Sequence, residues 1–136
     1  MSAAQNLIYA SVQVVHNFGA VAVVGGSLSA LWLHDVVARR RLAMVSLAGW
    51  LMQAASGATF GMVTFHYHRQ LPDISGVATY ALGIKMMCAI LAILLLASYL
   101  QKAEHWQEKS RNQTWVAASL LGISALSAAV FLRWFS

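Results

Sequence analysis

Residues Val77–Leu100 read VATYALGIKMMCAILAILLLASYL, an apolar run with a single charged side chain, Lys85. The run is longer than the ~20 residues that a membrane-spanning helix needs. The chain of 136 residues is 60% hydrophobic and 10% charged, with a mean hydropathy of +0.64. So much apolar surface does not fit into one soluble core of this size. Three further apolar runs have a similar length: Val14–Leu33, Leu42–Phe65 and Thr114–Leu132.

These four runs predict an all-α integral membrane protein. We expect an antiparallel four-helix transmembrane bundle that forms a single domain over residues 1–136. Its helices are expected at about residues 7–33, 42–66, 77–100 and 114–133. The segment before the first run carries no Lys or Arg, and no small-residue cleavage pattern follows the run, so we expect a retained helix rather than a signal peptide.

Basic residues gather in two of the three predicted loops. Six of the nine Lys and Arg residues lie there: Arg39, Arg40 and Arg41 in the first loop, and Lys102, Lys109 and Arg111 in the third. Because cytoplasmic loops carry an excess of Lys and Arg, this side is expected to be cytoplasmic and both termini periplasmic, in the bacterial inner membrane. The same topology explains the pI near 9.9 without a nucleic-acid partner.

Two histidines lie at the end of the second run, in Phe65-His66-Tyr67-His68, before a turn predicted at Pro72 to Gly76. Ionisable groups at membrane depth are costly and usually mark a site. With ~1.5 Å of rise per residue above the basic loops, His16 lies at ~34 Å and His66 at ~38 Å. Met62 and Arg133 fall in the same layer, whereas Lys85 at ~26 Å and Cys88 at ~21 Å would form the floor of a site open to the periplasm.

A b-type haem is the first candidate for this site. It needs two neutral imidazoles from facing helices and small residues that admit the porphyrin plane. His16, with Gly19 one turn away, would supply one axial nitrogen, and either His66 or His68 the other. The haem propionates would then be neutralised by Arg69, Arg133 and Lys85.

Copper is the alternative, because thioether and thiolate sulfur together with imidazole suit Cu(I). Its ligands would come from His16, His66, His68, Met62 and Cys88. A third interpretation has no cofactor: the histidines are polar helix ends, and the protein is a structural accessory subunit. His34 and His105 lie at the opposite end, beside Asp35 and Glu104, where the charged surroundings favour solvated interfacial histidines over a second site.

The order of these features resembles the CopD-like group of four-helix membrane domains. That group includes copper-resistance D-type proteins and the HemJ type of protoporphyrinogen oxidase. In topology the likeness covers nearly the full length, and in sequence it rests on three short motifs: His16-Asn17-Phe18-Gly19, Arg39-Arg40-Arg41 and Thr79-Tyr80-Ala81-Leu82-Gly83-Ile84-Lys85.

The two relatives imply different functions. The HemJ type implies haem b and gives ligand or catalytic importance to His16 and Lys85, whereas the D type implies copper transfer from the periplasm. The chain departs from both in adding His66-Tyr67-His68, and it lacks the histidine-bearing extended first loop of the HemJ type, which argues against porphyrin oxidation.

We therefore expect a small membrane protein that holds a redox centre near the periplasmic face. It would be an electron-transfer protein, or a subunit of a larger respiratory or metal-handling complex, with a quinone or a periplasmic redox protein as possible partner. If it is catalytic, it would be a haem-dependent membrane oxidoreductase. Lys85 is expected to act in the site, because an ammonium at that depth needs an anionic partner such as a haem propionate or a quinol-type anion.

Overall fold

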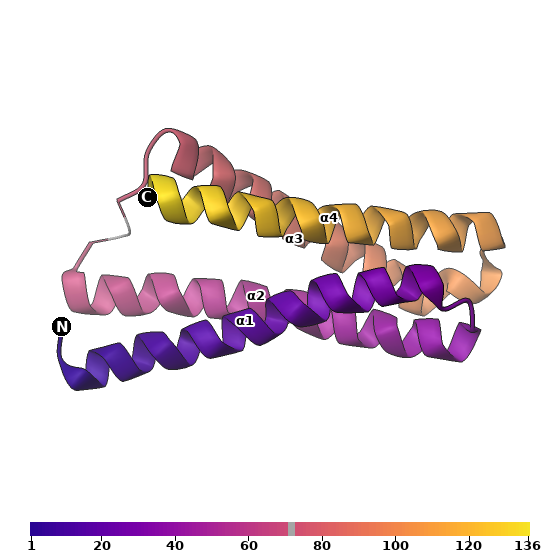
Figure 1. Cartoon of the computed structure of the whole chain (residues 1–136), viewed down its shortest axis with the longest axis horizontal. Helices are drawn as coiled ribbons and strands as arrows, with labels where there is room; N and C mark the ends of the chain where they lie inside the picture. Colours follow the sequence, from indigo (N-terminus) through magenta and orange to yellow (C-terminus); the bar gives the residue numbers. More distant parts are fainter. Residues whose placement is uncertain (71–72) are drawn as a thin grey trace.

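The computed structural model describes residues 1–70 and 73–136, and its described part consists of four long helices and one short helix. They are α1 (Ala3–Trp32), α2 (Val36–His68), α3 (Val77–Lys102), η1 (Ala103–His105) and α4 (Glu108–Phe135). Consecutive long helices run in opposite directions, and both termini lie at the same end of the molecule (Figure 1). The predicted all-α class with four long helices is confirmed.

The helices extend beyond the predicted apolar runs. The second helix begins at Val36 rather than near residue 42, and the fourth at Glu108 rather than near residue 114. Asp35 caps α2, because its side chain accepts a hydrogen bond from the Ala38 amide at 2.8 Å. The three arginines that follow are good helix formers, so the helix starts before the apolar stretch does.

At its other end α2 stops at Arg69, which has a φ of 56° and closes the helix in the left-handed conformation. Gly76, also at a φ of 56°, precedes α3, and this backbone suits glycine because it has no Cβ. Pro72, where the sequence predicts a turn, lies outside the described residues.

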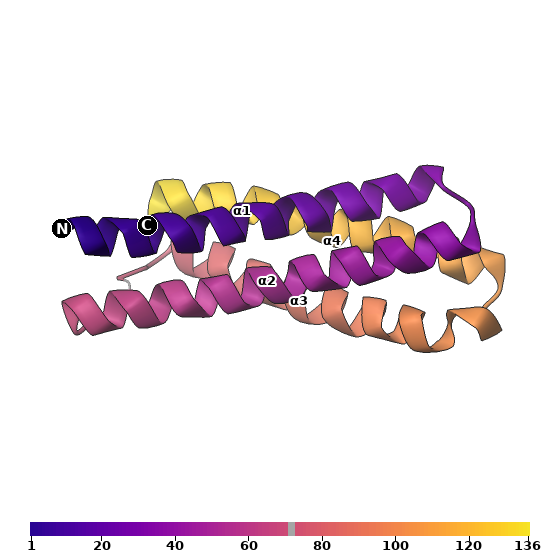
Figure 2. The same cartoon turned by 90° about the horizontal axis from the view of Figure 1, so that it is seen from below.

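The four helices form two hairpins, α1 with α2 and α3 with α4, with fewer contacts between the hairpins than within them. Figure 1 shows α1 crossing α2 at a shallow angle, and Figure 2, turned by 90°, shows the two helices side by side. Near the crossing a Cβ added to Gly49 would lie 2.9 Å from the Gly19 carbonyl oxygen, so these glycines let the two backbones approach. Between the hairpins, Gly122 of α4 lies against Val23 of α1.

The core lies mainly in the half of the bundle that contains the α1–α2 and α3–α4 turns. Trp50, Trp115 and Leu96 are almost completely buried there, and the Tyr99 ring packs against Trp115 at a centroid distance of 5.2 Å. Many large apolar side chains point outward instead, among them Val21, Leu94, Leu120 and Phe131. An apolar exterior of this kind fits contact with lipid.

Three of the long helical segments are long and apolar enough to cross a membrane: α1, α3 together with η1, and α4. The same criterion does not select α2, although its 33 residues give it sufficient length. Its polar residues, which include Gln53 and Ser56, lower its hydropathy.

Candidate functional site

His16 of α1 and Lys85 of α3 meet between the two hairpins. Lys85 Nζ lies 3.0 Å from His16 Nε2, within hydrogen-bond distance. On its other side the imidazole contacts α2, since His16 Nδ1 lies 2.7 Å from Ser56 Oγ. The His16 side chain therefore connects three of the four long helices.

These contacts assign the tautomer of His16. The Ser56 hydroxyl donates its hydrogen to the Met52 carbonyl at 2.6 Å, so its oxygen can only accept from the imidazole. His16 must then carry its hydrogen on Nδ1, which leaves Nε2 as an acceptor for a Lys85 N–H. The resulting chain of hydrogen bonds runs in one direction, from Lys85 through His16 and Ser56 to Met52.

The backbone around His16 is also fixed to α2. Gln53 Nε2 donates to the main-chain carbonyl of His16, while Gly19, one turn further along α1, lies at the close approach to Gly49. Ser56 is 5% exposed, so its hydroxyl lies away from solvent. The helix crossing thus positions the imidazole, because small residues on both helices bring Ser56 within its reach.

The cluster contains two basic side chains and no carboxylate. The chain has only four acidic residues, and all lie outside the middle of the long helices: Asp35, Asp73, Glu104 and Glu108. Lys85 lies ~12 Å along α3 from Val77 and ~26 Å from Lys102. No acidic residue of the chain lies at the level of the Lys85 ammonium group, so none can neutralise its charge.

The predicted single layer of His16 with His66 and His68 is wrong. His68 Nε2 lies 3.5 Å from Gln5 Nε2, and Tyr9 Oη lies 3.1 Å from Thr64 Oγ1, so the end of α2 pairs with the start of α1. His16 is opposite Ser56, which places His66 ~15 Å and His68 ~18 Å further along the bundle.

The error has a simple cause. The predicted depth of His16 counted every residue down to Arg39 as helical rise, but α1 ends at Trp32 and Arg39 already belongs to the ascending α2. Lys85, predicted to lie beneath the histidines, is at the level of His16.

Haem ligated by two histidines does not fit this arrangement. Both axial nitrogens of such a haem bind one iron, and imidazoles ~15 Å apart along the bundle cannot do so. Arg69 and Arg133, predicted to contact the propionates, are exposed at the end of the bundle that holds the termini.

The predicted copper ligands are also dispersed. Met62 is 65% exposed and lies ~9 Å beyond Ser56 along α2. Cys88 is buried on α3, one turn after Lys85. Within residues 1–70 and 73–136, no group of three or more His, Cys, Asp or Glu side chains is placed to hold a metal ion.

Ser56 and Gln53, which position His16, are absent from the predicted site. The signal for Gln53 was present, because it is the only side chain with an amide in the apolar run Leu42–Phe65. Ser56 gives no such signal, since a serine in a membrane helix usually hydrogen-bonds to its own helix, as Ser56 also does.

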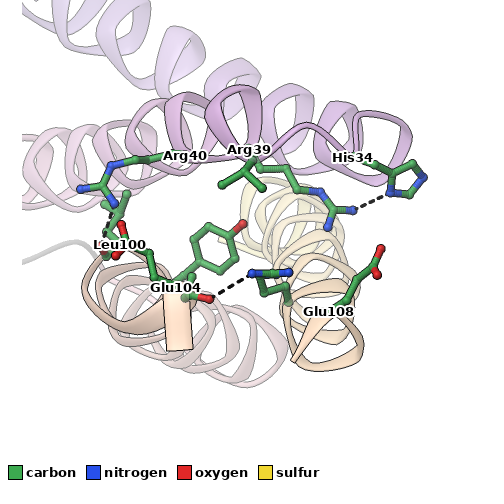
Figure 3. Close-up of a pocket in the computed structure, with 10 residues that line it drawn as sticks. His34, Arg39, Arg40, Leu100, Glu104 and Glu108 are labelled. Atoms are coloured by element: carbon green, nitrogen blue, oxygen red, sulfur yellow. Dashed lines mark hydrogen bonds between the residues drawn. The ribbon is translucent and has the colours of Figure 1, made fainter. Parts of the chain in front are cut away.

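At the opposite end of the bundle, His34 and His105 do not form a common site. His34 lines a pocket there, and its Nδ1 lies 3.3 Å from Arg39 Nη2 (Figure 3). His105 belongs to η1 and is not among the residues that line this pocket.

Comparison with models of protein families, with curated proteins and with solved structures finds no match to this chain. The likeness to the CopD-like group therefore stays a prediction from its short motifs. Function is inferred from the side chains described above.

Proposed function

We propose that the chain is an integral protein of the bacterial inner membrane with four spans, α2 being the fourth. The arginine-rich end is cytoplasmic and both termini are periplasmic. Three apolar helices of sufficient length support the membrane assignment, and the clustering of Lys and Arg at one end supports the orientation. A polar α2 is compatible with a span, because its polar side chains Gln53 and Ser56 are bonded to α1.

The function of this protein centres on His16 and Lys85, which bind the acidic group of an amphipathic redox ligand. The ligand is of the quinol type or, as the second choice, a haem b held through a propionate rather than by two histidines. The observation that carries the proposal is the 3.0 Å contact between Lys85 Nζ and His16 Nε2 at a level without a carboxylate. Lys85 is half-buried, and an ammonium group within a membrane costs several kcal/mol unless an anion meets it, so the missing partner is expected to be a ligand.

The two side chains have different roles. Lys85 supplies the charge, and its two remaining N–H groups are free to bond an anionic oxygen. His16 holds Lys85 in position and can accept a proton from it on Nε2, because Ser56 fixes the hydrogen on Nδ1. The pair can therefore pass a proton to or from a bound oxygen, which is the proton-transfer part of oxidation or reduction of a quinol-type ring. The two electrons would pass to or from a separate redox partner.

Replacing Lys85 by Met tests the proposal. Met keeps the length and apolar stem but removes the charge, so we expect ligand occupancy of the purified protein to fall about tenfold, as loss of a charge-assisted bond implies. Lys102→Met is the matched control, because Lys102 is exposed at the end of α3. Occupancy is measured by solvent extraction of purified protein, with mass spectrometry for quinones and the pyridine haemochrome spectrum for haem b.

Two results would refute the proposal. One is a wild-type protein that carries no redox-active ligand after gentle purification. The other is a Lys85→Met protein that keeps its ligand and its yield at the level of the Lys102→Met control.

A structural accessory role is the second candidate. It is favoured by the bonds from Ser56 and Gln53 to His16, which would hold α1 to α2 even without a ligand. In that case Ser56→Ala lowers stability, whereas Lys85→Met changes neither ligand content nor yield.

A further inference from the structure

A pocket lies at the end of the bundle opposite the termini, where α2 begins and α3 leads through η1 into α4 (Figure 1, Figure 3). Its cavity measures about 70 Å³. One water needs only ~10–15 Å³ of such space, so the pocket has room for a group with several oxygens. Tyr99, 4% exposed, forms part of its wall.

Three guanidinium groups line the pocket, and their hydrogen bonds within the chain go to neutral acceptors. Arg39, only 4% exposed, donates to the Ala30 and Leu33 carbonyls, at 3.2 and 2.7 Å, and to Asn112 Oδ1 at 2.6 Å. Arg40 donates to the Leu100 carbonyl at 3.2 Å (Figure 3), and Arg111 to the Ala103 carbonyl at 3.4 Å. Arg40 and Arg111 thus use one of five N–H groups each, and the rest are available to an anion.

Two carboxylates also line the pocket, but they are exposed to solvent, whereas Arg39 is buried. Glu104 and Glu108 are both exposed and lie across the pocket from Arg39 and Arg40 (Figure 3). Arg39 is buried and Arg111 half-buried, whereas Arg40 is exposed like the two glutamates. The less accessible charge of the pocket is therefore positive, and its negative charge is exposed.

We propose that this pocket binds a phosphate group, supplied by a phospholipid headgroup that also carries a primary amine. The guanidinium groups of Arg40 and Arg111 take the phosphate oxygens, a pairing that suits the planar fork of arginine. The exposed carboxylates of Glu104 and Glu108 take the ammonium group. The ligand class is therefore a phosphoethanolamine headgroup rather than a phosphoglycerol or phosphocholine one.

The position of the pocket favours a lipid as the source of the phosphate. It lies at the ends of α2, α3 and α4, which is the level of the headgroups in whichever leaflet this end of the bundle lies. Basic pockets between membrane helices are known to bind lipid headgroups at this depth. Inorganic phosphate has the same chemistry and must be separated from the lipid by experiment.

Native mass spectrometry of the purified full-length protein in detergent provides the test. The protein is titrated with dioleoyl phosphatidylethanolamine, phosphatidylglycerol and phosphatidylcholine, and each titration is repeated with sodium phosphate as competitor. We expect phosphatidylethanolamine to bind about two- to fivefold more tightly than phosphatidylcholine, because exposed carboxylates contribute little. Arg111→Gln should weaken all three lipids about tenfold.

Lys109→Gln is the matched control, since Lys109 is exposed, follows the pocket residue Glu108 in α4 and does not line the pocket. Glu104→Gln should abolish the preference for phosphatidylethanolamine over phosphatidylcholine and leave Arg111-dependent binding in place. Circular dichroism verifies that each variant is folded. Arg39 is not varied, because its bonds hold the α1–α2 turn to α4.

Three results would overturn the proposal. If Arg111→Gln binds lipid as the control does, the pocket is not a phosphate site. If sodium phosphate alone displaces every lipid, the ligand is free phosphate and the lipid assignment fails. If wild type binds phosphatidylcholine as tightly as phosphatidylethanolamine, the carboxylates do not recognise an amine.

Discussion

The most informative single residue is His16, because each of its polar groups has a partner. Its two ring nitrogens face Ser56 and Lys85, and its carbonyl accepts from Gln53. A polar side chain inside a membrane is tolerated when such partners are present. Lys85 differs, since among the described residues its side chain has one hydrogen bond, to a neutral acceptor, and no carboxylate partner. This difference between two neighbouring residues is why we assign the ligand to Lys85 and a positioning role to His16.

The hydrogen-bond chain makes a prediction about the proton of His16. In wild-type protein we expect the hydrogen on Nδ1, because the Ser56 oxygen can only accept. Solid-state NMR of 15N-histidine-labelled protein identifies the protonated nitrogen by its one-bond 15N–1H coupling, and His16→Gln assigns the signal. Ser56→Ala should reduce the Nδ1–H population. A wild-type signal from Nε2–H, or from a doubly protonated ring, would contradict this direction of hydrogen bonding.

At the scale of helices, the close crossing of α1 and α2 sets the geometry of the site. Gly19 and Gly49 lie at this crossing, one turn and two turns away from His16 and Ser56 respectively. A wider crossing would move Ser56 away from the imidazole. Gly57 is a glycine of the same helix with nothing within 4 Å of an added Cβ. Comparing an alanine substitution at Gly49 with one at Gly57 therefore separates the effect of packing from the effect of helix propensity.

We expect Gly49→Ala to destabilise the protein by about 1–3 kcal/mol, the usual cost of overpacking. Its new Cβ would lie 2.9 Å from Ala22 Cβ and 2.9 Å from the Gly19 carbonyl oxygen. To relieve these contacts the backbone of α1 or α2 would have to move. Gly57→Ala should be neutral or slightly stabilising, because alanine favours the helix and meets no neighbour. Both are measured by unfolding in sodium dodecyl sulfate followed by circular dichroism. Equal stabilities of the two variants would show that the crossing is not tightly packed.

For the molecule as a whole, the sequence was sufficient for the helices but not for their register. Apolar composition located the four helices, whereas the polar starts of α2 and α4 were missed, because Arg39 and Lys109 lie before the next apolar run but already belong to its helix. Because the start of α2 was predicted a few residues too late, the predicted level of His16 along α2 was wrong, and His66 appeared to lie opposite it. Lys85 stands out in the sequence as the single charged residue of its apolar run, but its contact with His16 depends on how the two hairpins pack, which no local pattern records.

The orientation of the molecule in the membrane is the last prediction. Cys88 is the only cysteine and is buried, so Cys88→Ala provides a background without reactive thiols. Ser110, exposed near the start of α4, and Ser136, at the C-terminus, lie at opposite ends of that helix. In intact cells an impermeant maleimide should label Ser136→Cys but not Ser110→Cys, and permeabilised cells should label both. The end of the bundle that holds Ser110 also holds five basic residues: Arg39, Arg40, Lys102, Lys109 and Arg111. Because moving this charge across the membrane is costly, we expect that end to stay in the cytoplasm. The opposite labelling pattern would place His16 and Lys85 nearer the cytoplasmic leaflet, where their ligand would have to be reached from inside the cell.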